Sequence, residues 1–262
     1  MNKLIFGDCL EKMQEISDNS INLILCDLPY GTTKCKWDST ISLDKLWLQY
    51  KRILNKESGV VVLFADQPFT SLLVTSNLKW FKYEFIWKKD KTTGYLNANY
   101  RPMKCSEDIL IFSPANASPS SKNKSNMTYN PQGLISKKVI KKNSEKRIGK
   151  MLNQKHHLGK NQILSDTEYT QEFTNYPVEI IEFKHENDTQ HPTQKPVAIC
   201  EYLIKTFSNE GEIVLDNCMG SGTTGLACKK TNRRFIGIEN EKKYFEIAQT
   251  RLSNLCFQSS LF

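Results

Sequence analysis

The chain lacks any long apolar run. Hydrophobic residues make up 39% of its 262 residues, yet no uninterrupted apolar stretch approaches the roughly 18 to 20 residues that a membrane-spanning helix needs. The start of the chain also lacks the basic residues and long apolar centre of a secretory signal peptide. These absences argue against membrane and secreted proteins, so we expect a cytoplasmic protein with no membrane partner.

Paired cysteines are lacking too. The eight cysteines stand at positions 9, 26, 35, 105, 200, 218, 228 and 256, and no two are spaced as Cys-x-x-Cys. Most lie within apolar stretches, which is typical of buried free thiols in a reducing compartment. The spacing gives little support to zinc, and we expect no metal site.

Acidic residues are nearly absent from one segment. Between Pro119 and Lys160, eleven Lys or Arg residues stand against Glu145 alone, and the resulting +10 exceeds the +8 of the whole chain. Few large apolar residues occur there, so the segment indicates a surface insertion or small subdomain. Concentrated Lys and Arg attract nucleic acid by neutralising its phosphates, although a solubilising loop has the same composition.

Two strand-to-loop transitions carry polar residues. The first follows the apolar run 22–26, where the chain turns at Asp27-Leu28-Pro29-Tyr30 and Gly31. Proline cannot continue a central strand, and glycine frees the backbone to turn. Because ligands of open α/β sheets bind at the carboxyl ends of strands, this turn is a candidate site. An ordinary turn with Asp27 as a local cap is the alternative.

The second transition lies near the end of the chain. A strand is expected over 212–216, a glycine-rich loop over 217–224, a helix up to Lys230 and another strand over 233–238. Glu239 closes that strand 19 residues after Gly220, close to the spacing at which a carboxylate receives ribose hydroxyls. The order favours a cofactor that contains a nucleoside. A third glycine is missing, which disfavours a dinucleotide, and Gly-Lys-Ser/Thr is missing, which excludes a Walker-type phosphate site.

Further elements alternate between strand and helix. Strands are expected over 60–64, 83–87 and 109–112, a helix over 43–54, and a final helix after Glu239 with Asn240 as its N-cap. Such alternation is typical of an α/β fold with a doubly wound, mostly parallel sheet.

Four blocks follow one another along the chain: Phe6-Gly7-Asp8-Cys9, Asp27-Leu28-Pro29-Tyr30, His191-Pro192-Thr193-Gln194-Lys195-Pro196 and Asp216-Asn217-Cys218-Met219-Gly220-Ser221-Gly222-Thr223. They match the N-terminal Gly-Asp segment, the D/N/S-P-P-Y/F catalytic motif, an upstream block and the D-P-F-x-G-S-G-T cofactor motif of the DNA amino-methyltransferases. The sequence therefore resembles this S-adenosylmethionine-dependent family, in the permuted group whose catalytic motif precedes the cofactor motif. It departs from the family pattern at Leu28, Asn217 and Cys218.

The resemblance implies a Rossmann-like methyltransferase fold with an inserted target-recognition region. We expect a catalytic half over 1–113, the basic insertion over 114–188, a cofactor-binding half over 189–257 and a tail over 258–262. It also implies methyl transfer from S-adenosylmethionine to a base flipped out of double-stranded DNA. Asp at the head of the catalytic motif favours adenine N6. Cytosine N4 methylation, action on RNA and a catalytically decayed DNA-binding protein are alternatives, and a nicotinamide-dependent oxidoreductase is a weaker one.

The catalytic roles and most cofactor-binding roles are carried over from the matching motifs, the role of Glu239 follows from its spacing, and the DNA-binding candidates are chosen for their basic charge. The catalytic group is Asp27, Leu28, Pro29 and Tyr30. The cofactor-binding group is Asp8, Cys9, Thr193, Lys195, Asp216, Cys218, Gly220, Ser221, Gly222, Thr223, Glu239 and Asn240. The DNA-binding candidates are Arg101, Lys104, Lys122, Lys124, Lys137, Lys138, Lys141, Lys142, Lys146 and Arg147.

The chain ends in Gln258-Ser259-Ser260-Leu261-Phe262. This peptide resembles the short Gln-x-Ser-Leu-Phe segments by which bacterial proteins dock on the replication sliding clamp, so the clamp is a candidate partner. A tail folded onto the core is the alternative. The family resemblance further implies a bacterial or phage enzyme, as part of a restriction-modification pair or alone, and allows a homodimer.

Overall fold

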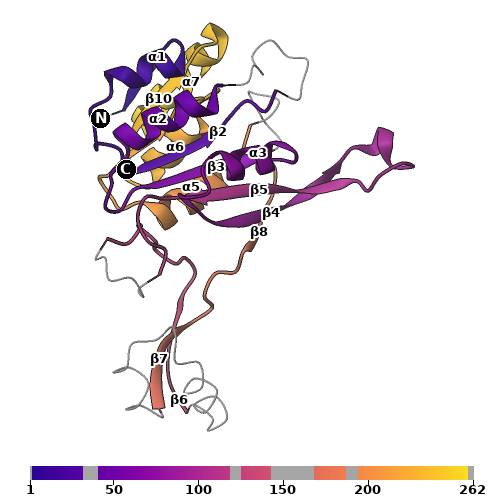
Figure 1. Cartoon of the computed structure of the whole chain (residues 1–262), viewed down its shortest axis with the longest axis vertical. Helices are drawn as coiled ribbons and strands as arrows, with labels where there is room; N and C mark the ends of the chain where they lie inside the picture. The colour runs from indigo at the N-terminus through magenta and orange to yellow at the C-terminus, as the bar shows by residue number, and fades with distance from the viewer. Residues whose placement is uncertain (1, 32–40, 119–124, 143–167, 187–193, 259–262) are drawn as a thin grey trace. The chain divides into compact units, whose positions relative to one another are not determined.

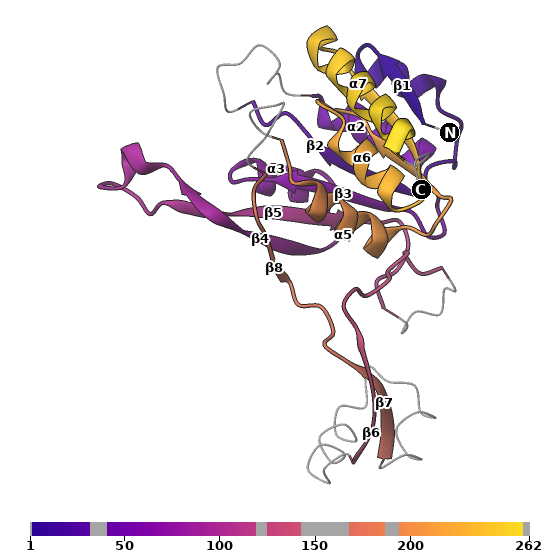
Figure 2. The same cartoon turned by 180° about the vertical axis from the view of Figure 1, so that it is seen from behind.

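The computed structural model describes residues 2–31, 41–118, 125–142, 168–186 and 194–258 (Figures 1 and 2). Among them, eight strands form one sheet in the order β1-β10-β9-β2-β3-β5-β4-β8. Their bounds in that order are β1 Lys3–Phe6, β10 Arg234–Glu239, β9 Ile213–Asp216, β2 Leu23–Asp27, β3 Val60–Ala65, β5 Lys104–Phe112, β4 Phe81–Thr93 and β8 Ile180–Phe183.

The first five strands in the sheet order are mutually parallel, and β5 alone runs antiparallel to both of its neighbours. Helices flank this sheet: α1 Cys9–Lys12, α2 Leu43–Ile53, α3 Phe69–Ser76, α5 Val197–Phe207, α6 Thr223–Lys230 and α7 Lys242–Gln258. The expected α/β fold with a doubly wound, mostly parallel sheet is confirmed.

Alternate residues of the central strands feed two separate cores. In β2, Leu23 and Leu25 pack with α5, α6 and α7, whereas Ile24 and Cys26 pack with α1, α2 and α3. Side chains alternate across a strand, so a strand buried on both faces is apolar throughout. Figures 1 and 2 show the two sets of helices on opposite sides of the sheet.

The parallel arrangement places four chain segments at one edge of the sheet. The carboxyl ends of β1, β2, β9 and β10 lead into the loops that begin at Gly7, Leu28, Asn217 and Asn240. Between β9 and β2 the strand order reverses, since β3 continues to one side and β10 and β1 to the other. Such a switch point leaves a crevice at the carboxyl ends of the strands, where open α/β sheets bind ligands.

Several local expectations need correction. Helix α7 begins at Lys242, and the Glu241 carbonyl accepts the first bond from the Phe245 N–H at 3.0 Å, so Asn240 is not its N-cap. Strands β4 and β5 are longer than the expected runs because their outer halves are polar or charged. Strand β1 was not expected at all, since its four residues are too few to show a pattern.

A second compact unit comprises Ser118–Asn123 and Pro131–Val178. Its described part is an antiparallel hairpin of β6 (Ile135–Lys142) and β7 (Glu168–Thr174), in which Ile135 pairs with Thr174. The insertion expected over 114–188 overlaps this unit, but Lys124–Asn130 and the segment from Glu179 belong to the main unit. None of the described helices is long and apolar enough to cross a membrane.

Candidate active site

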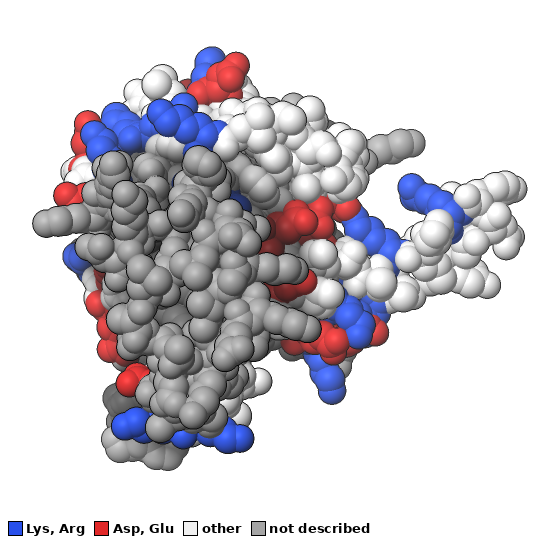
Figure 3. Space-filling view, turned by 60° about the horizontal axis from the view of Figure 1, so that its bottom comes forward, with Lys and Arg blue, Asp and Glu red and all other residues white. Residues whose placement is uncertain are grey.

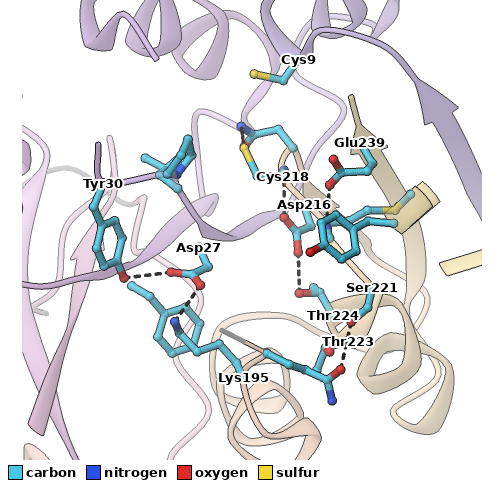
Figure 4. A pocket seen from close by; sticks show the side chains of 18 of the residues that line it. Cys9, Asp27, Tyr30, Lys195, Asp216, Cys218, Ser221, Thr223, Thr224 and Glu239 are labelled. Atoms are coloured by element: carbon cyan, nitrogen blue, oxygen red, sulfur yellow. Dashed lines mark hydrogen bonds and ion pairs between the residues drawn. The ribbon is translucent and has the colours of Figure 1, made fainter. Parts of the chain in front are cut away.

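A cavity of about 590 Å³ opens at the carboxyl edge of the sheet. All four sequence blocks contribute to its lining, among them Asp8, Asp27, Lys195 and Gly220, and Glu239 at the end of β10 adds to it. Its volume lies within the range of small-molecule and cofactor sites. Figure 4 shows that one wall carries Asp27, Tyr30 and Lys195 and the opposite wall carries Asp216, Cys218 and Glu239.

Asp27 ends β2 and is held from two sides. The Tyr30 hydroxyl lies 2.8 Å from Asp27 Oδ1, and the Lys195 ammonium lies 2.6 Å from Oδ2. One face of the Tyr30 ring stacks on Phe69, with ring centroids 5.1 Å apart. Leu28 is buried at 3% exposure, and Pro29 lines the cavity beside it. The structure thus brings the predicted catalytic residues together in one wall.

Glu107 completes this wall, and the sequence did not suggest it. Its carboxylate lies 2.8 Å from Lys195 Nζ, 2.6 Å from Lys89 Nζ and 3.1 Å from the Tyr30 hydroxyl. Glu107 is only 6% exposed. Glu107 stands just before the apolar run of β5. In the sequence alone, a charged residue at that position is typical of a loop. Because β5 is antiparallel to β3, its amino-terminal half returns to the edge where β2 ends.

Two carboxylates and two ammonium groups therefore share a buried site. Burial, together with the neighbouring Glu107 charge, raises the pKa of Asp27 against the opposing effect of Lys195. Burial alone would raise the pKa of Glu107, but the charges of Lys195 and Lys89 outweigh it and hold that pKa at about 2. Burial opposes the charge of Lys195, yet Asp27 and Glu107 raise its pKa. Lys195 thus remains a cation paired with both acids, whereas the resemblance had suggested a contact to the cofactor.

On the opposite wall, Asp216 organises the glycine-rich loop. Its Oδ2 accepts a hydrogen bond from the Thr224 hydroxyl at 2.6 Å, and its Oδ1 accepts one from the Cys218 N–H at 3.1 Å. Burial raises the pKa of Asp216, and these hydrogen bonds offset only part of that effect, so the pKa is about 7. Asp216 lines the cavity, but its contacts here are with the loop.

Glu239 faces the same loop from the end of β10. Its two carboxylate oxygens accept backbone hydrogen bonds from Gly220 and Glu241, both at 2.8 Å. Burial raises its pKa. Gly220 has a φ of +50°, and no heavy atom lies within 4 Å of the position that a Cβ would occupy. The loop therefore offers open space beside the carboxylate.

The loop is also fixed from behind by residues that sequence reasoning missed. Arg251 of α7 donates hydrogen bonds to the Ser221 carbonyl at 2.6 Å and to its hydroxyl at 2.8 Å. The Ser221 hydroxyl in turn lies 3.0 Å from Gln194 Oε1. Gly222 has a φ of +82°, and a Cβ there would lie 3.0 Å from that of Ala248, so the loop packs closely on α7. Spacing gave no signal for Arg251 because 30 residues separate it from Ser221.

The departures from the family motif have partners of their own. The hydroxyl of Tyr50, a fully buried residue of α2, donates to Asn217 Oδ1 at 2.6 Å. The Cys218 thiol interacts with the free thiols of Cys9 and Cys26; this interaction and burial raise the pKa of Cys9, and burial raises the pKa of Cys26 to about 12. The raised pKa values of these thiols make them poor nucleophiles.

The chain matches the family described as DNA methylase over residues 21–250. The chain belongs to the DNA methylase family. It is 27% identical over 273 residues to the type II methyltransferase M.HpaI of Haemophilus parainfluenzae, covering 96% of this chain and 74% of that protein. It is also 27% identical over 261 residues to the DNA adenine methyltransferase YhdJ of Escherichia coli K12, covering 95% and 82%. The crystal structure of an M1.HpyAVI–SAM complex superposes with a TM-score of 0.62 at 25% identity, covering 96% of this chain and all of that one.

Membership of the methylase family confirms the resemblance seen in the motifs, and with it a DNA methyltransferase that uses S-adenosylmethionine. The cavity fits this cofactor on observations of its own. Glu239 is an acceptor for hydroxyl groups, and Gly220 lines the cavity with open space at its Cβ position.

Asp8 and Cys9 of the methylase lie where β1 ends. The Asp8 carboxylate caps α1 by accepting from the N–H groups of Leu10 at 2.8 Å and Glu11 at 3.1 Å. Gly7 is tied to Glu239 by a backbone hydrogen bond of 3.0 Å. Asp8, Cys9, Thr223 and Asn240 all line the cavity.

The DNA-binding candidates of the methylase fall into three groups. Arg101, Lys137 and Lys138 are exposed, whereas Lys104 is ion-paired with Asp66. Lys141 and Lys142 belong to β6, and their side chains are outside the described part of the structure. The remaining predictions, Thr193, Lys122, Lys124, Lys146, Arg147 and the tail from Ser259 to Phe262, also lie outside the described residues.

Proposed function

We propose that this enzyme methylates adenine N6 in double-stranded DNA, at a base that is flipped into the cavity. One observation carries the proposal: the Asp27 wall and the Glu239 wall face each other across a single cavity. A target base and a methyl donor need such adjacent subsites. The target must leave the stack because its amino group is inaccessible within the duplex.

Adenine is supported by the carboxylate at the head of the catalytic motif and by the likeness to YhdJ, which is described as an adenine methyltransferase. Cytosine N4 is the second candidate, since its amino group presents the same chemistry. The residues of the Asp27 wall can bind either amino group, so the product must be identified by experiment.

The chemical problem is a weakly nucleophilic amine, whose lone pair is delocalised into the ring. Asp27 and the backbone carbonyl of Leu28 accept hydrogen bonds from the two amino hydrogens, which localises the lone pair on nitrogen. Asp27 must be ionised to act only as an acceptor, and Lys195 at 2.6 Å favours that form. The Tyr30 ring, backed by Phe69, stacks on the base, a contact worth roughly 1 to 3 kcal/mol by analogy with single-strand binding proteins.

Bound S-adenosylmethionine supplies an electrophilic methyl group. Glu239 would receive its ribose hydroxyls, Asp8 and Cys9 would contact its adenine, and Gly220, Ser221 and Thr223 would allow close backbone approach. Asp216 holds this loop in shape through its bonds to Cys218 and Thr224. Holding the amine and the donor in line accounts for much of the acceleration.

Recognition of the DNA sequence belongs, in this proposal, to the basic insertion 114–188. Lys137 and Lys138 on β6 are exposed and suited to contact phosphates. The β6–β7 hairpin is suited to enter the major groove of DNA, because a two-stranded ribbon fits that groove.

The test is methyl transfer from labelled S-adenosylmethionine to unmethylated genomic DNA, with RNA as the control and nucleoside mass spectrometry as the readout. The proposal expects N6-methyladenine from DNA alone. Detection of N4-methylcytosine would show that the target base is cytosine and not adenine. Cofactor binding without any methylated product would indicate a decayed DNA-binding protein.

We also propose two partners, the replication sliding clamp and a second copy of the chain. Docking of Gln258–Phe262 on the sliding clamp predicts that deletion of 258–262 abolishes retention on immobilised clamp while methylation is unchanged. Equal retention of the full chain and the deletion variant would exclude docking through this peptide. A homodimer is tested by sedimentation of the full chain.

A further inference from the structure

Strands β4 and β5 continue well past the sheet as a two-stranded ribbon. β4 pairs with β8 only as far as Lys89, and beyond that residue β5 is its one paired strand among the described residues. A 3₁₀ helix, Tyr95–Asn97, follows β4 at the tip. Figure 3 shows the ribbon as a projection, with both blue and red side chains around its base and a largely white tip that carries some blue. An isolated two-stranded ribbon is only marginally stable in water, so this one is suited to be covered by a partner.

The tip carries large side chains that nothing in the described structure covers. Residues 90–102 are all exposed, and Tyr95, Leu96 and Tyr100 are 79%, 93% and 90% exposed. Gly94, at a φ of +91°, makes the turn into the tip. Two aromatic rings and a leucine on one tip exceed the scattered apolar residues of an ordinary surface and mark an interaction site.

The charges on the ribbon identify the class of partner. Asp90, the acid nearest to the tip on β4, is held by His185 at 2.6 Å, and no acidic residue occurs between 91 and 103. Lys91 and Arg101 are the charged residues of that stretch, and Arg101 is exposed. Cations beside aromatic rings suit a polyanion with flat, stackable groups, which is the chemistry of nucleic acid. They disfavour contact between the ribbons of two copies, because like charges would meet.

The base of the ribbon belongs to the active site. Trp87, Lys89, Thr93 and Glu107 line the cavity, and Lys89 is ion-paired with Glu107 beside Lys195. At about 3.3 Å per residue, the six residues from Lys89 to Tyr95 span at most roughly 20 Å, because the register shift between Lys88 and Thr93 shortens the path. That limit corresponds to about six base pairs, since successive phosphates on one strand are about 3.4 Å apart along the axis.

We propose that the β4–β5 ribbon is a second DNA-binding element, which holds the duplex on one side of the target base. Tyr95, Leu96 and Tyr100 contact base edges and sugars in a groove within about six base pairs of the target, and Arg101 contacts a phosphate. This inference rests on the proposed DNA methylation. It adds a flank requirement that is separate from the recognition of the target sequence.

The test uses the full chain and duplexes that contain its methylation site, located beforehand by sequencing of methylated DNA. One flank at a time is shortened from about ten to about two base pairs, a series that brackets the reach of the ribbon. Affinity is measured for the wild type, for the triple variant Tyr95→Ala, Leu96→Ala, Tyr100→Ala, and for a control, Leu48→Ala with Leu78→Ala. The control leucines are 67% and 65% exposed and lie outside the cavity lining.

Wild type and control should lose at least about tenfold in affinity when one flank falls below about six base pairs, an effect the size of the lost burial of one large apolar side chain. The triple variant should bind the long duplex as weakly as the wild type binds the short one, and show no flank dependence. Binding of S-adenosylmethionine, measured by calorimetry, should be equal in all three. Equal flank dependence in wild type and triple variant would overturn the proposal, and loss of a wild-type dimer in that variant would then assign the tip to a second copy.

A single exposed substitution gives an independent check on the same ribbon. Arg101→Gln should lower the slope of log affinity against log salt by about one, the loss of one phosphate contact. An unchanged slope would contradict the proposal. If the wild type binds cofactor and DNA but methylates neither base, the proposed function fails, and the salt slope of Arg101→Gln on a duplex of any sequence still tests the ribbon on binding alone.

Discussion

At the scale of single residues, the active site depends on how charges are paired in a confined space. Asp27 is an acceptor only while it is ionised, yet burial and Glu107 both raise its pKa. Lys195 counters this by lying 2.6 Å from Asp27 and 2.8 Å from Glu107. Removing one member of such a buried set leaves the others uncompensated, so the residues are expected to act as a unit.

Asp27→Ala is expected to abolish methyl transfer while S-adenosylmethionine binds nearly as tightly as before, because Asp27 contacts the Tyr30 and Lys195 wall rather than the glycine-rich loop. Calorimetry measures the cofactor and nucleoside mass spectrometry the product. Equal loss of binding and transfer would instead indicate a folding defect and remove this role from Asp27.

Glu107→Gln is expected to reduce kcat by about 10- to 100-fold, the scale of a small misplacement of catalytic groups. The acidic limb of the kcat–pH profile should move to lower pH, because the Glu107 charge that raises the pKa of Asp27 is gone. Glu84→Gln on the exposed part of β4 is the control. A profile that does not move would leave Glu107 with a purely structural role.

Asp216 makes stability depend on pH. Its folded pKa of about 7 lies above the ordinary value of 3.8, so the folded state holds a proton that the unfolded chain releases. The stabilisation from this group is greatest below about pH 4 and is lost as the pH rises to about 7, by at most about 4 kcal/mol.

Asp216→Asn keeps an acceptor for the Cys218 N–H and can donate to the Thr224 hydroxyl, but it does not titrate. Urea unfolding at pH 4.5 and pH 7.5 should therefore show a smaller fall in the free energy of unfolding for the variant than for the wild type. An identical fall in both proteins would mean that Asp216 ionises normally when folded.

At the scale of elements, the cofactor loop is shaped by helices on both faces of the sheet. Arg251 of α7 holds Ser221 from one side, and Tyr50 of α2 holds Asn217 from the other. The loop therefore arrives at the cavity already ordered, which lowers the entropic cost of binding. The same contacts couple distant helices to cofactor affinity.

Tyr50→Phe is expected to destabilise the protein by about 1 to 3 kcal/mol, because it leaves the Asn217 carbonyl oxygen without its buried donor. Cofactor affinity should fall as well. A double-mutant cycle with Asn217→Ala separates this contact from packing, and the two changes should be clearly less than additive in the double variant. Strict additivity would show that the hydrogen bond contributes nothing.

At the scale of the whole molecule, charge and chemistry are carried by different parts of the chain. The main unit contains the cavity, whereas the +10 of residues 119–160 falls largely within the second unit and its flanks. DNA affinity should therefore depend steeply on salt while cofactor affinity does not.

Lys137→Gln with Lys138→Gln is expected to lower the slope of log DNA affinity against log salt by about two, one unit for each phosphate contact. Binding of S-adenosylmethionine should be unchanged. Lys45→Gln with Lys51→Gln on α2, equally exposed, should leave the slope as it is. If both pairs have the same effect, only net charge matters and the hairpin has no specific role.

The sequence by itself determined the fold class, the family and the two principal motifs. Each is a local pattern: an apolar run of one strand, followed by Asp27-Leu28-Pro29-Tyr30 or by the glycine loop before Glu239. Such patterns are readable because backbone turns and strand burial depend on neighbouring residues. Among the elements that stayed unpredicted, β1 and the outer halves of β4 and β5 lack that pattern because they are short or exposed.

The tertiary structure alone decided which distant residues meet. Glu107, Lys89 and Arg251 reach the site only because an antiparallel strand returns to the carboxyl edge and α7 packs behind the loop. It also showed that Lys195 pairs with Asp27 and that Asp216 hydrogen-bonds within its own loop, contacts that the motifs do not reveal. Ion pairs and hydrogen bonds act over a few ångströms in space, and separation along the chain carries no record of them.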